Sequence, residues 1–222
     1  MLAEVLESAA KLQEVVPDAV LVGGAAAAWY AGHRVSFDHD HTLSDLRERF
    51  DLILDAIEST DGWVTNRVVP NKLILGRLGD IEAGVRQLIR RRPLETTDVK
   101  LPSGTKVRVP TIDEILRIKA YLIVNRNQTR DFVDVVALAD SLNGNAAATT
   151  LAGIDEYYAD QHGEGQGVAS QLVRQLGEPR PKDTGTTREL AHYRRLDPKW
   201  HDWSAVVAAS QELAQQIVRV AV

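Results

Sequence analysis

The hydrophobic and polar positions at the start of the chain change from a helical to an extended period. Apolar residues at positions 2, 5, 6, 9, 12 and 16 recur every three or four residues, which predicts an amphipathic helix that Pro17 ends. Residues 19–22 are a short run rich in β-branched side chains, followed directly by Gly23-Gly24. Such a run closed by glycines is typical of a buried strand and a tight turn.

Helix and strand signals continue to alternate after this turn. Residues 25–30 are strong helix formers. Residues 36–42 predict a second strand, and apolar positions between 46 and 57 again recur at helical spacing. Ser44 stands where it can cap this helix at its N-terminus.

The middle of the chain predicts strands and the remainder predicts helices. Turn signals separate four expected strands, at 63–69, 73–78, 81–88 and 106–109. From Thr111 the apolar spacing becomes helical, and helices are expected at 111–125, 131–142, 147–160, up to 176, 189–195 and 203–220. A Pro- and Gly-containing stretch at 177–187 resembles a linker. The predicted fold class is α/β (α+β), with a mixed-sheet core over 1–110 and a helical C-terminal region over 111–222.

Composition places the chain among ordinary globular proteins. It has 222 residues, of which 44% are hydrophobic and 26% charged, enough for one large domain or two small ones. No window approaches the roughly 18 consecutive apolar residues of a membrane span, and the first residues lack a secretory signal pattern. No membrane partner is therefore expected, and the expected location is the cytoplasm. The absence of Cys excludes disulfides, thiolate metal sites and cysteine nucleophiles.

Charge is distributed unevenly along the chain. The net charge is −5, but residues 86–130 contain eleven basic and four acidic residues. This segment therefore carries 11 − 4 = +7, and the remainder −12. We expect the segment to face an anionic ligand. Within it, the run Arg90-Arg91-Arg92 is either a solvent-exposed turn or a contact to an RNA backbone.

Two aspartates and two glycines form the pattern with the clearest chemical meaning. Asp38 and Asp40 stand two apart on the expected second strand, so their side chains share one face and suit a hard cation such as Mg²⁺. Gly23 and Gly24 precede a helix, where backbone N–H groups can approach a phosphate closely. A metal site together with oriented phosphates is what nucleotidyl transfer requires.

The order of these motifs resembles a known superfamily. Val22-Gly23-Gly24 with Asp38-His39-Asp40 is similar to the signature of the DNA polymerase β nucleotidyltransferase superfamily. Residues 32–40 together with 111–134, which include Lys119, Arg126 and Asp134, resemble its AbiEii/MenT branch, whose members include toxins of bacterial toxin–antitoxin systems. The resemblance covers roughly residues 20–140.

The resemblance implies roles for the residues around the aspartates. Asp38 and Asp40 would coordinate Mg²⁺ bound to a nucleoside triphosphate, and Gly23 and Gly24 would cradle its phosphates. Ser36 occupies the place of a small hydroxyl residue beside the metal. The third carboxylate of the superfamily has no clear counterpart, because Asp80 falls in an expected turn. Glu82, on the following strand, is the better candidate.

The later motif implies roles for basic residues and one more aspartate. Lys119 and Arg126, seven residues apart, would neutralise triphosphate charge, or they are a solvated helix face. Asp134 would orient Lys119 or act as a base on the acceptor hydroxyl, or belong to a local set of ion pairs with Arg130 and Asp131. Arg34 either reaches a phosphate or only follows a helix end.

The implied function is Mg-dependent transfer of a nucleoside monophosphate to the 3′ end of tRNA, by a toxin that a separate antitoxin protein restrains. One alternative is a nucleotidyltransferase acting on a small molecule such as an antibiotic. Another is a non-catalytic module that binds a nucleotide or a partner. His39 and His41 are expected to be surface or packing residues rather than metal ligands, and the aromatic residues at 157, 158, 200 and 203 are expected in the core.

Overall fold

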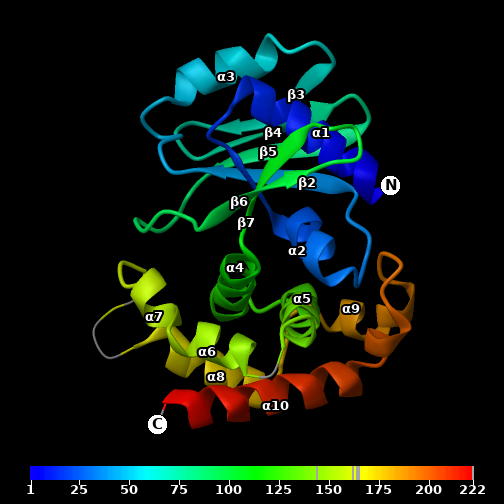
Figure 1. The fold of residues 1–222 in the computed structure, drawn as a ribbon, viewed down its shortest axis with the longest axis vertical. Coiled ribbons are helices and arrows are strands. Elements are labelled where there is room, and N and C mark those ends of the chain that lie inside the picture. The colour runs from blue at the N-terminus through cyan, green and yellow to red at the C-terminus, as the bar shows by residue number, and fades with distance from the viewer. Residues whose placement is uncertain (144, 162, 164–165, 222) are drawn as a thin grey trace. The chain divides into compact units, whose positions relative to one another are not determined.

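The computed structural model describes residues 1–143, 145–161, 163 and 166–221. The chain forms two compact units, which are both visible in Figure 1. Unit 1 consists of Met1–Trp29 and Val35–Thr111, and unit 2 consists of Tyr30–Arg34 and Ile112–Val222. The main boundary between the units therefore follows Thr111, where the sequence pattern changes from strands to helices. The short segment Tyr30–Arg34 comes from the N-terminal half of the chain but belongs to unit 2.

Unit 1 is built on a mixed sheet. Its described strands are β1 (Val20–Val22), β2 (Asp38–Leu43), β3 (Trp63–Val69), β4 (Leu73–Leu78) and β5 (Ile81–Gln87). They lie in the order β1-β2-β5-β4-β3. Strand β2 pairs in antiparallel with β1 and in parallel with β5, whereas β4 is antiparallel to both β3 and β5. The mixed sheet predicted from the sequence is confirmed.

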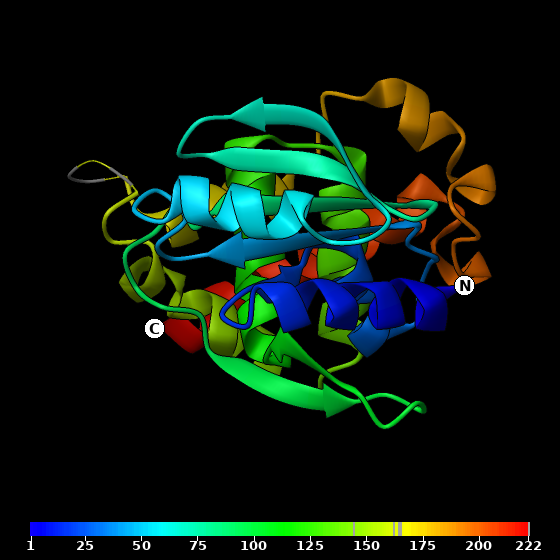
Figure 2. The same cartoon turned by 90° about the horizontal axis from the view of Figure 1, so that it is seen from above.

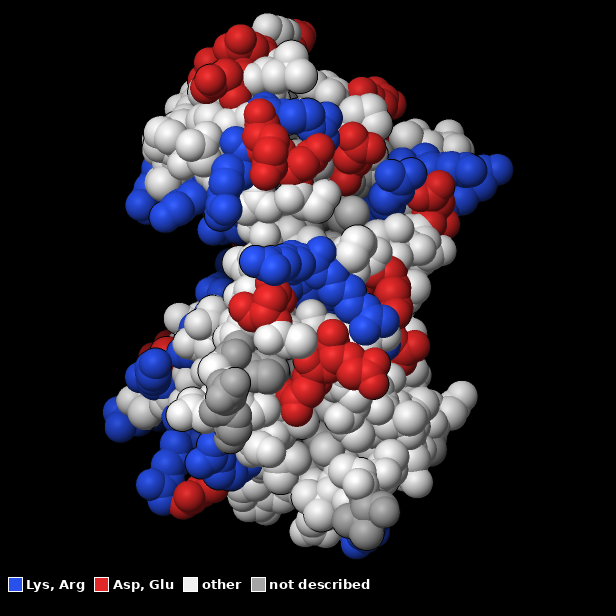
Figure 3. All heavy atoms as spheres, turned by 90° about the vertical axis from the view of Figure 1, so that its left-hand side faces the viewer, with Lys and Arg blue, Asp and Glu red and all other residues white. Residues whose placement is uncertain are grey.

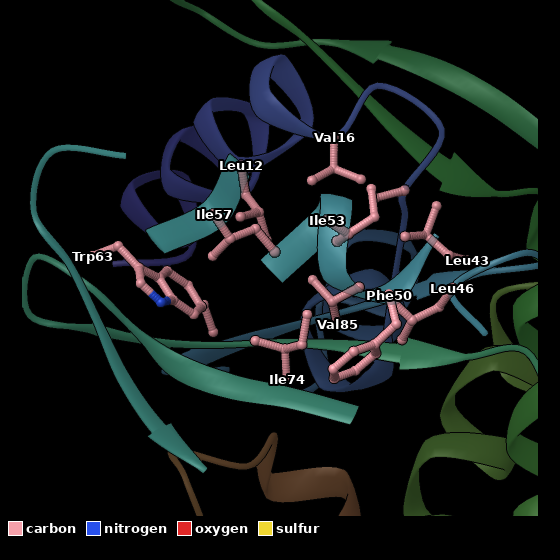
Figure 4. Packing of buried hydrophobic residues seen from close by; sticks show 12 residues of the cluster. Leu12, Val16, Leu43, Leu46, Phe50, Ile53, Ile57, Trp63, Ile74 and Val85 are labelled. Carbon is pink, nitrogen blue, oxygen red and sulfur yellow. The ribbon is translucent and has the colours of Figure 1, made fainter. Parts of the chain in front are cut away.

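Two helices cover one face of this sheet. Figure 2 shows α1 (Leu2–Val15) and α3 (Phe50–Glu58) on the same side of the strands. Their apolar positions meet the sheet in one cluster, in which Leu12 packs with Ile57 and with Val85 of β5 (Figure 4). All three side chains are almost completely buried. The helical spacing of apolar residues therefore determines which face of the sheet is covered.

A second, smaller sheet completes unit 1. It pairs β6 (Thr96–Lys100) with β7 (Lys106–Pro110). Strand β7 is held to α1 by the Gln13 side chain, whose Nε2 donates to the Arg108 carbonyl at 2.9 Å and whose Oε1 accepts from the Arg108 N–H at 2.7 Å. Strand β6 was not predicted, because four of its five residues are exposed and it lacks the apolar alternation of a half-buried strand.

The described part of unit 2 is helical, as the sequence predicts. Its long helices are α4 (Ile112–Asn125), α5 (Thr129–Asp140), α8 (Val168–Gly177) and α10 (Trp203–Ala221). The shorter ones are α6 (Ala146–Ala152), α7 (Ile154–Tyr157), α9 (Thr184–Arg188), η1 (Leu190–His192) and η2 (Pro198–Trp200). Helix α10 packs against α5, α6 and α8. No helix of the described residues is long and apolar enough to cross a membrane.

Four local predictions were wrong. The helix expected at 189–195 is only the short 3-10 helix η1, and Arg194 and Arg195 have a positive φ. Ser44 does not cap a helix, because α3 begins only at Phe50, after a turn in which the Asp45 carbonyl accepts from the Arg49 N–H. The helix expected over 147–160 is interrupted at Gly153. The stretch 177–187 is anchored rather than a linker, since Asp183 Oδ1 accepts hydrogen bonds from the Thr129 N–H at 2.7 Å and hydroxyl at 2.8 Å.

Two buried histidines on β2 make the stability of unit 1 depend on pH. Burial lowers the pKa of His39 to about 4, which nearby Asp38 only partly offsets, and burial together with His39 holds the pKa of His41 well below its usual value. Between pH 6.5 and 4 the unfolded chain therefore binds more protons than the folded one, so stability falls as the pH falls. His39 alone is expected to cost about 2 kcal/mol between pH 7.5 and pH 5.

Urea unfolding at these two pH values measures this effect. A His39→Gln variant, which keeps a polar partner for Ser8 but does not titrate, should show a smaller difference between the two pH values. The buried Asp134 of unit 2 does not contribute to this difference, because its pKa lies well below its usual range and it stays ionised at both pH values. Equal unfolding free energies of the native protein at pH 7.5 and pH 5 would contradict the prediction.

Candidate functional site

Strand β2 separates its histidines from its aspartates. His39 and His41 are buried on the side of α1, where His39 Nε2 lies 3.0 Å from the Ser8 hydroxyl. Because successive side chains of a strand point to opposite faces, Asp38 and Asp40 lie on the other face of the sheet. Both aspartates are partly accessible. The expectation that the histidines are packing residues and that the aspartates share one face agrees with this arrangement.

Two glycines leave the space that the Asp40 carboxylate occupies. Gly23 has a φ of +72°, and a Cβ built on it would lie 3.3 Å from Asp40 Oδ2. Gly84 is the cross-strand partner of Asp40 on β5, and its Cβ would lie 3.0 Å from Asp40 Oδ1 and 2.8 Å from Leu75 Cδ2. A side chain at either position would crowd the carboxylate. Gly23 was predicted from the sequence but Gly84 was not, because the role of Gly84 depends on the pairing of β2 with β5.

Asp38 and Asp40 each have a polar neighbour of unit 1. The buried Ser36 hydroxyl donates to Asp38 Oδ1 at 2.9 Å, so it orients this carboxylate. The Arg86 Nε lies 3.4 Å from Asp40 Oδ1. Arg86 leaves about half of its side chain exposed and Asp40 about a third, so solvent and ligands can reach this pair.

Glu82 lies beside the aspartates but does not complete a metal centre. The parallel register pairs Glu82 with Asp38, which places both side chains on the same face, whereas Asp80 lies in the turn between β4 and β5. Among the described residues, no three acidic or histidine side chains converge as a metal site. Mg²⁺ often takes only one or two carboxylates and completes its shell with phosphates and water. Asp38, Asp40 and the glycine cradle fit such an ion, and Glu82 as a third ligand stays a prediction.

A second polar group lies in the interior of unit 2, around Asp134 of α5. Its Oδ1 lies 2.7 Å from His33 Nε2 and 2.7 Å from Arg34 Nε, and its Oδ2 lies 2.7 Å from Lys119 Nζ. At most 6% of any of these four residues is exposed. The segment containing His33 and Arg34 thus joins α4 and α5 through one carboxylate. His33 was not predicted as a member, although it stands directly before Arg34.

The Asp134 group carries an excess of positive charge. Burial would raise the pKa of Asp134, but Arg34, Lys119 and the hydrogen bonds from His33 and Arg34 hold it well below its usual range. Burial lowers the pKa of Lys119, and Asp134 partly offsets this effect. The Asp134 carboxylate alone faces both the Lys119 ammonium and the Arg34 guanidinium. Such an excess is costly to bury, and an anionic ligand would compensate for it.

Arg126 is engaged differently from its expected role. It lies just beyond the end of α4, and its guanidinium forms two hydrogen bonds to the buried Asp131, at 2.8 and 2.5 Å. Asp131 in turn belongs to the capping box at the start of α5. This pair fixes the connection between α4 and α5, so a contact from Arg126 to a phosphate stays a prediction.

The basic segment 86–130 does not form one continuous surface. Arg90 is buried and donates to the main-chain carbonyls of Arg92 and Pro93, whereas Arg91 and Arg92 are exposed. Arg117 is bound to Glu114 at 2.9 Å, and Lys119 is buried. On the face drawn in Figure 3, Lys and Arg lie among Asp and Glu. Several cations of this segment are therefore used in local hydrogen bonds and ion pairs and do not contribute to a common basic surface.

The aromatic residues of the C-terminal half are mostly packing residues, as expected. Tyr158 is buried and stacks on Tyr121, with ring centroids 4.2 Å apart. Trp200 is buried, and Trp203 forms a T-shaped pair with Phe132, with ring centroids 5.9 Å apart. Tyr157 lies under the Arg117 guanidinium. None of these contacts requires a stacked base.

Comparisons with known proteins place this geometry in a family. The family model of the nucleotidyl transferase AbiEii toxin of type IV toxin–antitoxin systems matches residues 4–215. The MenT4 nucleotidyltransferase toxin of Mycobacterium tuberculosis superposes with a TM-score of 0.63 at 15% identity, over 98% of this chain and 82% of that one. The antibiotic-resistance factor ANT(2'')-Ia superposes with a TM-score of 0.50 at 14% identity, over 71% and 93%. These structures share the fold.

A different kind of relative appears among the similar sequences. The heme uptake protein MmpL11 of Mycobacterium tuberculosis is 35% identical over 209 residues, which cover 82% of this chain and 20% of MmpL11. The MmpL11 of Mycolicibacterium smegmatis, a mycolic acid-containing lipids exporter, is 44% identical over 99 residues, 45% of this chain and 10% of that protein. The chain thus spans at most about a fifth of the length of these relatives.

Proposed function

The chain belongs to the AbiEii nucleotidyl transferase toxin family, and from this premise we propose that it is a nucleotidyltransferase that transfers a nucleoside monophosphate from a nucleoside triphosphate to the 3′ end of tRNA. The observation that carries the proposal is the cradle of Asp40, formed by Gly23 and Gly84 next to Asp38. It leaves an accessible pair of carboxylates on one sheet face, beside the N-terminus of a helix.

The residues of unit 1 have distinct tasks in this reaction. The acceptor hydroxyl oxygen forms a bond to the α-phosphorus, the bond to the bridging oxygen breaks, pyrophosphate leaves, and the hydroxyl proton passes to water. Asp38 and Asp40 would hold Mg²⁺, which when bound neutralises charge on the phosphates. Ser36 keeps Asp38 in position, and the Gly23 backbone admits a phosphate close to the start of α2 (Gly23–Ala31).

The Asp134 group of unit 2 suits charge neutralisation better than proton transfer. A general base works best with a pKa near the operating pH, but the pKa of Asp134 is well below even the ordinary aspartate value. Of its two expected roles, Asp134 therefore orients Lys119 and Arg34. The net positive charge of this group suits a phosphate ligand, because both cations are held rigid and largely desolvated.

The proposed acceptor and biological setting rest on the resemblance to the AbiEii/MenT branch and on the match to a toxin family. A type IV toxin is restrained by an antitoxin, so we expect a cognate antitoxin protein and action on tRNA in the cytoplasm. The distinctive product would be tRNA with an altered 3′ end that no longer accepts an amino acid.

Labelling of RNA tests this proposal. Purified protein is incubated with Mg²⁺, total RNA and each of the four labelled nucleoside triphosphates, and we expect one nucleotide to label a tRNA-sized band. An aminoglycoside panel is run in parallel, because the ANT(2'')-Ia neighbour shares the fold. Labelling of a drug with no labelling of RNA would replace tRNA by a small-molecule acceptor.

The MmpL11 relatives favour a second candidate function. In those proteins the matching region is a small part of a much larger chain, so the domain can serve as a module that binds a nucleotide for its host. Calorimetry distinguishes this candidate from the enzyme. Binding of a Mg–nucleotide complex without any labelled product, for RNA or drug, would support the module.

A further inference from the structure

Three arginines share the sheet face of Asp38 and Asp40. Arg86 of β5 lies two positions beyond Gly84, and Gly84 is the partner of Asp40. Arg77 of β4 is the cross-strand partner of Glu82, which is in turn paired with Asp38. Arg67 of β3 is paired with Leu75, the partner of Gly84. Because cross-strand partners point to the same side of a sheet, all three arginines lie on the face opposite α1 and α3.

These arginines are available to a ligand. All three are exposed. Among the described residues, Arg67 and Arg77 form no ion pair, and Arg86 has only the 3.4 Å contact to Asp40. Arg77 and Glu82 are cross-strand partners, but they form no salt bridge in the described part of the chain. The charge of the Arg77 guanidinium is therefore not neutralised by Glu82. The face therefore carries carboxylates on β2 and uncompensated guanidinium groups toward β3.

One row of cross-strand partners leads from the carboxylates to Arg67. Asp40, Gly84, Leu75 and Arg67 form one cross-strand row. Gly84 has no side chain, and its neighbour Leu75 is partly buried. Neighbouring strands lie about 5 Å apart, so Arg67 stands about 15 Å from Asp40 and about 10 Å from Gly84. A nucleotide chain that ends at Asp40 and runs along this row toward β3 would place successive phosphates near the arginines.

We propose that Arg86, Arg77 and Arg67 form a track that holds the sugar-phosphate backbone of the RNA acceptor as it leaves the transfer site toward β3. The inference rests on the proposed function and assigns the surface that its substrate uses. Arginine suits this task because its planar fork binds phosphate oxygens in pairs. RNA is favoured over an acidic protein because the track is continuous with the carboxylates at which the acceptor end must react.

Binding of RNA measured without transfer tests the track. Fluorescently labelled deacylated tRNA is titrated with protein by anisotropy, without nucleoside triphosphate, at 50 and 200 mM salt. The double variant Arg67→Ala/Arg77→Ala should bind at least tenfold more weakly. The slope of log affinity against log salt should become shallower by about 2, one unit for each lost phosphate contact.

The matched control removes two exposed cations elsewhere in unit 1. Lys11 lies on α1 and Arg47 lies in the turn before α3, and both are exposed. The Lys11→Ala/Arg47→Ala variant should bind tRNA within twofold of the native protein. Equal losses in both double variants would show a general charge effect and overturn the track. Unchanged tRNA binding of Arg67→Ala/Arg77→Ala, with lost binding of labelled polyglutamate, would assign the surface to an acidic protein instead.

The outcome is separable from that of the proposed function. If the native protein labels tRNA and the arginine variant binds it normally, the track is wrong and the function stands. If tRNA binding depends on the arginines but no nucleotide is transferred to it, the track stands and the proposed reaction is wrong. Absence of tRNA binding by the native protein at 50 mM salt would overturn the track.

Discussion

Replacing Asp40 by asparagine is expected to lower the rate of nucleotide transfer about a thousandfold, which corresponds to about 4 kcal/mol of transition-state stabilisation. The substitution keeps the shape of the side chain between Gly23 and Gly84 but removes the charge that a divalent ion requires. The fold should be unaffected, because about a third of the Asp40 side chain is exposed and its partner Arg86 is about half exposed. The measurement is the initial rate of label transfer, with circular dichroism to verify the fold.

Asp80 provides the matched control for Asp40. It lies in the exposed turn before β5, so Asp80→Asn changes the same charge within unit 1 without touching the aspartate face. We expect its transfer rate within twofold of the native rate. Titration with Mn²⁺, detected by electron paramagnetic resonance, should show weaker ion binding for Asp40→Asn only. A native transfer rate in Asp40→Asn would refute the assignment of the metal site.

Replacing Asp134 by asparagine is expected to lower the unfolding free energy of unit 2 by about 3–5 kcal/mol, because it leaves buried cations without a counter-charge. Asp134 is completely buried and accepts from His33, Arg34 and Lys119. An asparagine would keep the volume but present a neutral amide to Arg34 and Lys119. Urea unfolding at pH 7.5 measures the loss.

Asp140 on the same helix is the control for this prediction. Its partner is Lys199 at 2.5 Å, and half of each side chain is exposed. Exposed ion pairs contribute at most about 1 kcal/mol, so Asp140→Asn should shift the transition only slightly. Adding Lys119→Met to Asp134→Asn removes one of the uncompensated charges and should recover part of the stability. Additive losses in this double variant would contradict the proposed coupling.

Some features follow from local patterns and were therefore predictable. The strands at 63–69 and 73–78 were predicted with the bounds that the structure shows. Their signals are the residues of each strand and the turn residues that directly flank it, so no distant residue is needed to recognise them. The aspartate face is of the same kind, because a spacing of two on any strand places side chains together. The start of a helix at Gly23-Gly24 and the change to helices after Thr111 also depend on neighbouring residues alone.

Other features depend on residues that are far apart in the chain. The basic segment 86–130 suggested one anion-binding surface, but burial of Arg90 and Lys119 and the pairing of Arg126 with Asp131 divide it. Charge along a sequence does not predict charge on a surface, because each side chain's exposure is set by distant packing partners.

The sequence by itself indicated the family, most of the strands and helices in their order, and the aspartates proposed to hold the metal ion. Only the tertiary structure decided that Gly84 lies against Asp40, that His33 joins Arg34 and Lys119 on Asp134, and that Arg67 and Arg77 share the aspartate face. The physical reason is register. Local periodicity fixes which side of an element a residue occupies, whereas strand pairing and helix packing fix which residues of other elements it meets.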